Sequence, residues 1–191
     1  MNQDQLQALL TKVQQGALAV PDALHRLRTL PYENLGFASL DHHRALRQGF
    51  PEVIFCEGKT VSQVVAIAKT LLRKNNALLA TRVEPSVARA LLRVSKRAVY
   101  HEAARVVAIA PPKLVRRGAV LIVTAGTADI PVAEEARVTA DIMGSKTDTL
   151  YDVGVAGLHR LLGQQERLHD ARALIVVAGM DGALFSVIGG L

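Results

Sequence analysis

The 191-residue sequence has a single cysteine, no tryptophan and an aromatic content of only 4%. One cysteine excludes an intramolecular disulfide, which is typical of proteins from a reducing compartment. The apolar runs 119–123 and 173–178 are too short to cross a bilayer, and residues 1–15 are amphipathic rather than a signal sequence. These features predict a cytoplasmic protein with no membrane partner.

Half of the residues are apolar, which suits a globular α/β core. Lys and Arg outnumber Asp and Glu by 23 to 17, and the resulting charge of +6 favours anionic partners. Aromatic residues that could stack on bases are scarce, and no helix-turn-helix or zinc-finger pattern is present. We therefore interpret the basic residues as a solvated face and expect no nucleic-acid partner.

The first half of the chain predicts a helical arm followed by a small α/β domain. Helical spacing covers residues 3–15 and 21–30, and the stretch 31–49 is polar and irregular. Strands and helices then alternate, and they are expected at 52–56, 60–73, 77–83, 85–94 and 106–109. This alternation indicates a βαβ layer with parallel strands. Pro111-Pro112 and the basic stretch 113–118 place a domain boundary between residues 112 and 113.

The second half has a more regular α/β pattern. The run 119–123 is continuously apolar, as in a strand buried on both faces. Strands and helices are expected in alternation at 131–143, 149–153, 156–162 and 174–178, with a last helix from 182. The pattern predicts the first part of a doubly wound parallel sheet, and residues 113–191 form this second domain.

The first candidate site is the turn after the first strand of this sheet, with Gly126, Thr127 and Asp129. Ligands bind at the carboxyl ends of strands in open α/β sheets, and the amides of the following helix suit phosphate. Gly126 allows close approach of the backbone, Thr127 offers a hydroxyl, and Asp129 can hold a ribose. The alternative is an ordinary turn in which Asp129 caps the helix.

Two further turns follow the next two strands. Gly154 precedes His159 and Arg160, which could shuttle a proton and clamp a phosphate or carboxylate, or form an ordinary exposed pair. In the third turn, Gly179 and Gly182 flank Asp181. The carboxylate of Asp181 could act as an acid or base, or simply cap a helix. All three turns fall at one edge of the predicted sheet, and this convergence favours a site.

Other motifs are weaker. His42 and His43 are adjacent, but no convincing ligand set surrounds them, so we expect no metal site. Gly58-Lys59-Thr60 resembles the end of a phosphate-binding P-loop, but Val53 replaces the upstream glycine. Cys56 lies at the end of a predicted strand, and we expect it to serve packing.

As a set, these motifs resemble the LarB family of nickel-pincer cofactor synthases. The matching segments are 40–52, 58–60, 123–135, 151–160 and 175–190. The second half is also similar to PurE, the carboxyaminoimidazole ribonucleotide mutase, which has a Gly-Ser-x-Ser-Asp loop, a Ser-Ala-His-Arg turn and a glycine-rich third loop. The counterparts here are 126–129, 156–160 and 178–182.

The resemblance to LarB implies a PurE-like sheet in a homo-oligomer, an octamer in that family. It implies nicotinic acid adenine dinucleotide as substrate and carbon dioxide or bicarbonate as co-substrate, with no covalently bound cofactor and with a need for Mg²⁺ left open. The ring would be carboxylated and the phosphoanhydride cleaved, giving pyridinium-3,5-biscarboxylic acid mononucleotide and AMP.

In this reading Asp181 is the base that removes the ring proton, where the family has Glu. Thr127 and Asp129 hold ribose or phosphate, and His159 and Arg160 lie near the anionic groups. The family's nucleophilic cysteine follows the third loop, beyond the counterpart of Leu191, so we expect a C-terminally truncated and inactive chain. The alternatives are a PurE-type aminoimidazole ribonucleotide mutase and a non-catalytic nucleotide-binding protein.

Overall fold

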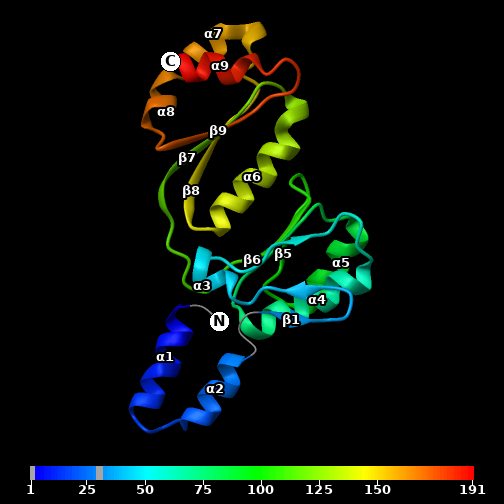
Figure 1. The fold of residues 1–191 in the computed structure, drawn as a ribbon. Coiled ribbons are helices and arrows are strands. Elements are labelled where there is room, and N and C mark those ends of the chain that lie inside the picture. The colour runs from blue at the N-terminus through cyan, green and yellow to red at the C-terminus, as the bar shows by residue number, and fades with distance from the viewer. Residues whose placement is uncertain (1–2, 29–31) are drawn as a thin grey trace.

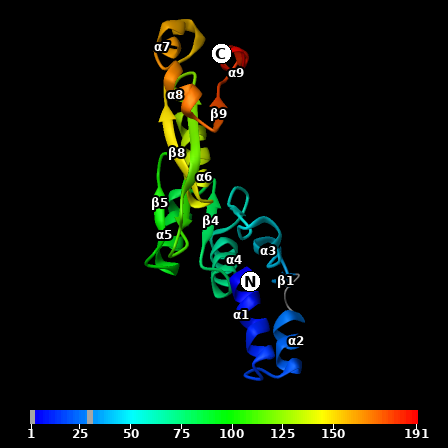
Figure 2. The same ribbon diagram turned by 90° about the vertical axis from the view of Figure 1, so that its left-hand side faces the viewer.

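The computed structural model describes residues 3–28 and 32–191, which form a mixed α/β structure as the sequence predicts. A helical arm lies at one end, a first sheet in the middle, and a second sheet with the C-terminus at the other end (Figure 1). Figure 2 shows the same order from the side. None of the helices in these described ranges is long and apolar enough to cross a membrane.

The arm consists of α1 (Gln3–Gln14) and α2 (Val20–Arg28), close to the predicted bounds. The two helices contact each other, and Leu9 and Ala23 are buried. Pro21 lies in the first turn of α2, where its missing N–H costs no helical hydrogen bond. The predicted extension of this helix to residue 30 falls partly outside the described residues.

The stretch from residue 32 to 49 is more ordered than the sequence predicts. β1 (Glu33–Asn34) and β2 (Ser39–Leu40) pair antiparallel, and α3 (Arg44–Gln48) follows. The turn between the strands contains Gly36 with a φ of 84°, and its amide donates to the Asn34 side chain. Such short elements give no periodic pattern, which is why the prediction of irregular structure was wrong here.

The first sheet has the strand order β3-β4-β6-β5. Its strands are β3 (Ile54–Phe55), β4 (Leu78–Thr81), β5 (Val99–His101) and β6 (Val106–Ile109). Only β3 and β4 are parallel, so the prediction of an all-parallel layer was wrong. β5 was missed, and the short connection 102–105 between β5 and β6 requires an antiparallel pair.

Helices α4 (Val61–Lys74) and α5 (Pro85–Val94) pack on this sheet, and both confirm the prediction. Thr60 caps α4, because its hydroxyl accepts from the Gln63 amide while the Gln63 side chain accepts from the Thr60 amide. Buried residues of α4 and α5 share one apolar cluster with β4, including Leu71, Leu78 and Leu91.

The second sheet has three parallel strands in the order β8-β7-β9. Its strands are β7 (Arg117–Thr124), β8 (Ser145–Leu150) and β9 (Ala173–Val177). The prediction of a strand at 149–153 was largely wrong, because β8 starts at Ser145. β8 is an edge strand with Lys146 and Asp148, and edge strands tolerate such charges.

Four helices accompany this sheet, and they are α6 (Ile130–Ile142), α7 (Leu158–Leu162), α8 (Gln165–Asp170) and α9 (Ala183–Gly190). Leu121 and Val123 of β7 pack with buried residues of α7, α8 and α9 in one cluster. The prediction missed α8, whose only buried residue is Leu168 and which therefore has no apolar stripe.

α6 joins the two sheets. Val138 and Ile142 on this helix pack against Leu79 and Val106 of the first sheet, although α6 also contacts all three strands of the second. The two halves therefore share buried apolar surface. The predicted boundary between residues 112 and 113 stays a prediction, and β7 already begins at Arg117, inside the expected linker 113–118.

Candidate ligand-binding rim

Three loops follow the carboxyl ends of β7, β8 and β9. We call residues 125–129 the first loop, 151–157 the second and 178–182 the third, and the three together the rim. Because the strands are parallel and adjacent, the loops leave the same edge of the sheet, as Figure 1 shows near α7 and α9. This is the arrangement that the sequence predicts, and it is where ligands bind in sheets of this kind.

Ala125 ties the first loop to both neighbours. Its amide donates to the carbonyl of Val177 at 3.0 Å, and its carbonyl accepts from the amide of Gly154 at 2.8 Å. A β-carbon on residue 154 would lie 2.7 Å from that same carbonyl oxygen. Gly154 is therefore required for loop packing, and its predicted role in ligand binding stays a prediction.

Asp129 lies between the first and third loops. Its Oδ2 accepts from the amide of Gly126 at 2.8 Å, while a β-carbon on Gly179 would lie 3.9 Å from its Oδ1. One carboxylate oxygen is thus used within the turn, and the other faces the third loop. Asp129 is the N-cap residue of α6, but its side chain makes no cap hydrogen bond to that helix, unlike in the capping alternative. Thr127 is exposed on the short helical turn Thr127–Asp129.

The second loop is held by its first residues. Asp152 has a φ of 60°, its amide donates to the Thr124 hydroxyl at 3.0 Å, and its carboxylate accepts from Arg160 at 2.7 Å. Both partners of this ion pair are about half exposed, so the pair contributes little to stability. His159 is exposed on α7 next to Arg160.

Asp181 is exposed in the third loop, between Gly179 and Gly182. Gly182 has a φ of 76°, a left-handed conformation that glycine adopts without strain. Thr127, His159 and Asp181 therefore project from loops or helices at one edge of the sheet. Their roles in binding and catalysis stay predictions.

Four residues that were assigned no role from the sequence help to build the rim, namely Thr124 and Asp152, which begin the first two candidate turns, and Glu134 and Tyr151. Thr124 is fully buried, and its hydroxyl and carbonyl accept from the amides of residues 152 and 153. A threonine at the end of an otherwise apolar strand was the available signal. Glu134 gives no such signal, because a glutamate in a predicted helix is expected to face solvent.

The motifs set aside earlier are accounted for by structure. His42 is buried with its Nε2 3.0 Å from Glu33, and burial lowers the pKa of its imidazole. Burial likewise raises the pKa of the Cys56 thiol to about 11. Within residues 3–28 and 32–191, no group of three or more His, Cys, Asp or Glu side chains could hold a metal ion.

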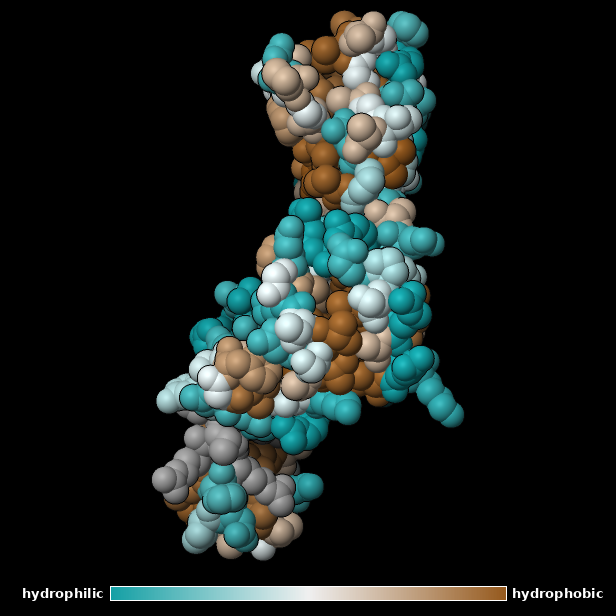
Figure 3. All heavy atoms as spheres, turned by 90° about the vertical axis from the view of Figure 1, so that its right-hand side faces the viewer, coloured by the Kyte–Doolittle hydropathy of each residue, from teal (hydrophilic) through white to brown (hydrophobic). Residues whose placement is uncertain are grey.

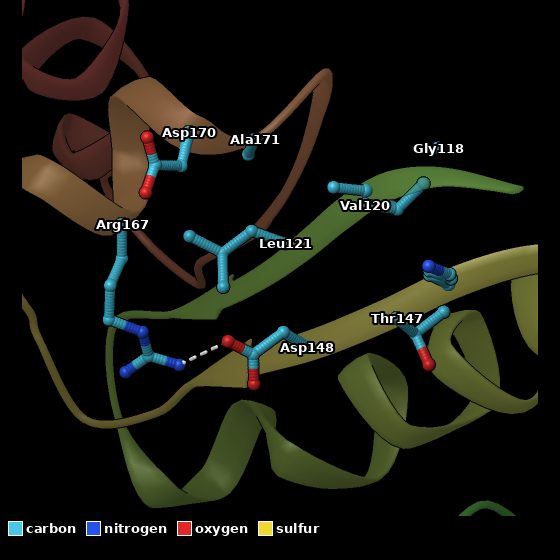
Figure 4. A pocket seen from close by; sticks show the side chains of 10 residues that line it. Gly118, Val120, Leu121, Thr147, Asp148, Arg167, Asp170 and Ala171 are labelled. Carbon is cyan, nitrogen blue, oxygen red and sulfur yellow. Dashed lines mark hydrogen bonds and ion pairs between the residues drawn. The ribbon is translucent and has the colours of Figure 1, made fainter.

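A pocket of about 210 Å³ lies on the other half of the second sheet (Figure 4). Leu121 lines it, together with Asp148 and Arg167, whose side chains form an ion pair at 2.7 Å. Its strand residues are Gly118–Leu121 of β7 and Lys146–Asp148 of β8, which precede the carboxyl ends of the strands where the rim lies. Residues of α6 and β9 line an apolar groove. Figure 3 shows apolar surface on the upper part of the face that α6 occupies.

Comparison with known proteins covers both halves of the chain. Residues 32–111, which contain the first sheet, match the family model of the LarB/PurE-like N-terminal domain. Over 97% of its length the chain is 34% identical to an uncharacterised protein of Methanocaldococcus jannaschii, 77% of which it covers. That similarity therefore extends across the second sheet and its rim. The chain belongs to the LarB-related family.

Proposed function

We propose that this chain forms the nucleotide-binding part of a LarB-type enzyme, built on a PurE-like doubly wound sheet. The substrate is nicotinic acid adenine dinucleotide, and the products are pyridinium-3,5-biscarboxylic acid mononucleotide and AMP, on the route to the nickel-pincer cofactor. The observation that carries the proposal is the convergence of the three family-like loops, joined through the backbone of Ala125. The assembly is a homo-oligomer in a cytoplasmic setting.

The rim offers the groups that binding requires. Thr127 and the amides of the first loop suit a phosphate, since the first turn of a helix carries unpaired N–H groups. Arg160 pairs with Asp152 in the free protein and exchanges that carboxylate for a phosphate or carboxylate of the ligand. Asp129 is placed to accept from a ribose hydroxyl through the oxygen that faces the third loop.

The chemistry needs a nucleophile, carbon dioxide and a base. A thiolate adds to a ring carbon of the pyridinium, and the resulting dihydropyridine forms a carbon–carbon bond to carbon dioxide. Asp181 takes the proton from the carboxylated ring carbon, and departure of the thiolate restores the aromatic ring. Water then attacks phosphorus and breaks the phosphoanhydride, which releases AMP.

Cys56 is not the thiol of this reaction. It is buried in the first sheet, and its raised pKa disfavours the thiolate at neutral pH. The proposal therefore gives residues 1–191 binding and proton transfer, and takes the thiol from outside them. A non-catalytic nucleotide-binding role is the second candidate, and the buried state of Cys56 favours it.

Calorimetry with AMP tests the binding proposal. We expect T127V and R160M each to weaken AMP binding about tenfold, the loss typical of a charged or polar contact to phosphate. R89M, which changes an exposed arginine on α5, serves as the matched control and leaves affinity unchanged. No binding by the unaltered protein, or equal losses in all three variants, would overturn the proposal.

Mass spectrometry tests whether the thiol lies outside residues 1–191. After incubation with nicotinic acid adenine dinucleotide and bicarbonate, we expect residues 1–191 to bind nucleotide without carboxylating the ring. Appearance of the carboxylated mononucleotide would contradict the assignment of the thiol to another segment. D181N leaves AMP affinity unchanged, because the proposal places Asp181 at the nicotinate ring, which AMP lacks.

A further inference from the structure

Two consecutive glutamates on α6 make contacts in different directions. Glu135 places Oε2 3.0 Å from Nε of Arg82, directly after β4 of the first sheet. Glu134 accepts from Tyr151, the first residue after β8 of the second sheet. α6 is therefore linked to both sheets through neighbouring carboxylates, and only Glu134 makes a link that leads to the rim.

Glu134 is held in one geometry. Its Oε1 accepts from the Tyr151 hydroxyl at 2.5 Å and from Nε of Arg137 at 2.9 Å, while Oε2 accepts from Nη2 of Arg137 at 2.8 Å. The Glu134 side chain is only 17% exposed. Three hydrogen bonds on a largely buried carboxylate, two of them in a fork from arginine, fix its position.

Around neutral pH the Tyr151 hydroxyl is protonated and donates to an ionised Glu134 carboxylate. Hydrogen bonds from Arg137 lower the pKa of Glu134. Burial, together with the bond to Glu134, raises the pKa of Tyr151 to about 12.

Tyr151 directly precedes the part of the second loop that needs support. Asp152 has a φ of 60°, a left-handed conformation that is strained for a non-glycine residue, so its neighbours must hold it in place. Thr124 fixes the Asp152 amide from the inner side, and Tyr151 anchors the chain from the side of α6.

We propose that Glu134 is a positioning residue. Through its hydrogen bond with Tyr151 it fixes the second loop and Arg160 in position beside the first loop, so that both loops can bind the nucleotide. This inference rests on the proposed function for the identity of the ligand, but the fixation of the loop is independent of it. α6 begins directly after Asp129, so Glu134 connects the helix that follows the first loop to the strand end that starts the second.

Hydrogen exchange of residues 152–160 tests the positioning directly. We expect E134A and Y151F to speed exchange in this segment about tenfold. E134Q recovers most of the protection, because its amide oxygen still accepts from Tyr151. E135A is the matched control, since it removes a neighbouring carboxylate with an ion pair to the first sheet and leaves exchange at 152–160 unchanged.

AMP affinity provides the second readout. E134A and Y151F weaken binding about tenfold, as supporting residues commonly do. The double variant binds AMP no more weakly than either single variant, because both substitutions remove the same hydrogen bond. Equal rates of hydrogen exchange at residues 152–160 in E134A and E135A would overturn the inference. So would an exchange rate in Y151F that equals that of the unaltered protein. If the unaltered protein binds no AMP, the proposed function falls, while the exchange experiment still decides the role of Glu134.

Discussion

The carbonyl oxygen of Ala125 accepts a hydrogen bond from the amide of Gly154, and a β-carbon at position 154 would lie 2.7 Å from that oxygen. The first two loops of the rim therefore approach as closely as the backbone allows. Gly154 has a φ of −60°, so its backbone suits any residue and only the contact with Ala125 demands glycine.

We predict that G154A destabilises the protein by about 1–3 kcal/mol, the usual cost of forcing a methyl group into a packed site. Urea unfolding followed by circular dichroism measures the loss. G189A is the control, because nothing lies within 4 Å of its β-carbon position and alanine is a better helix residue than glycine. An unchanged unfolding midpoint for G154A would contradict the close contact.

Cys56 is predicted to be inert in the folded protein. It is buried and its pKa is raised to about 11, so at pH 8 the thiolate is rare and shielded. Iodoacetamide at pH 8 should label the native protein far more slowly than protein in 6 M guanidinium, as read by intact mass. Equal labelling rates in both states would show that the thiol is accessible.

Shortening a side chain of α6 that packs on the first sheet should lower the stability of both sheets. Ile142 is 3% exposed and packs with residues of the first sheet, so I142A should cost about 2–5 kcal/mol. M143A, at an adjacent position that is 49% exposed, is the control and should cost little. Hydrogen exchange should speed in both sheets of I142A, and loss of protection in one sheet alone would argue against a shared core.

Acid should destabilise the protein partly through Glu134. Hydrogen bonds from Arg137 lower its folded pKa, so the unfolded chain takes up a proton first as the pH falls. The stabilisation is complete at neutral pH and is lost from about pH 5 downward through the folded pKa. E134Q should therefore lose less stability than the unaltered protein between pH 7 and pH 4. E166Q, at an exposed position on α8, should follow the unaltered protein.

Several features of the fold could be predicted from local sequence. Thr60 and Gln63 mark the start of α4, and the apolar run 119–123 marks the centre of β7. Predictions failed where an element has no apolar period. β8 carries Lys146 and Asp148 along an exposed edge, and β5 is only three residues long.

Some residues of the candidate site could likewise be predicted from local sequence, and others could not. Gly126, Asp129, Gly179 and Asp181 stand in turns after apolar strands, and this position alone pointed to the rim. The role of Gly154 could not be predicted, because it depends on the carbonyl of Ala125, 29 residues away. Likewise, the pairing of Arg160 with Asp152 follows from the shape of the second loop.

The sequence by itself determined the helices with strong caps or apolar stripes, the buried strand β7, and the three glycine-bearing turns. These depend on side-chain periodicity and backbone preference, which act over a few residues. Only the tertiary structure decided that the first sheet is mixed, that α6 packs on both sheets, and that Glu134 bonds to Tyr151. Those outcomes depend on which surfaces meet after the chain folds, and contacts between distant residues leave no local period in the sequence.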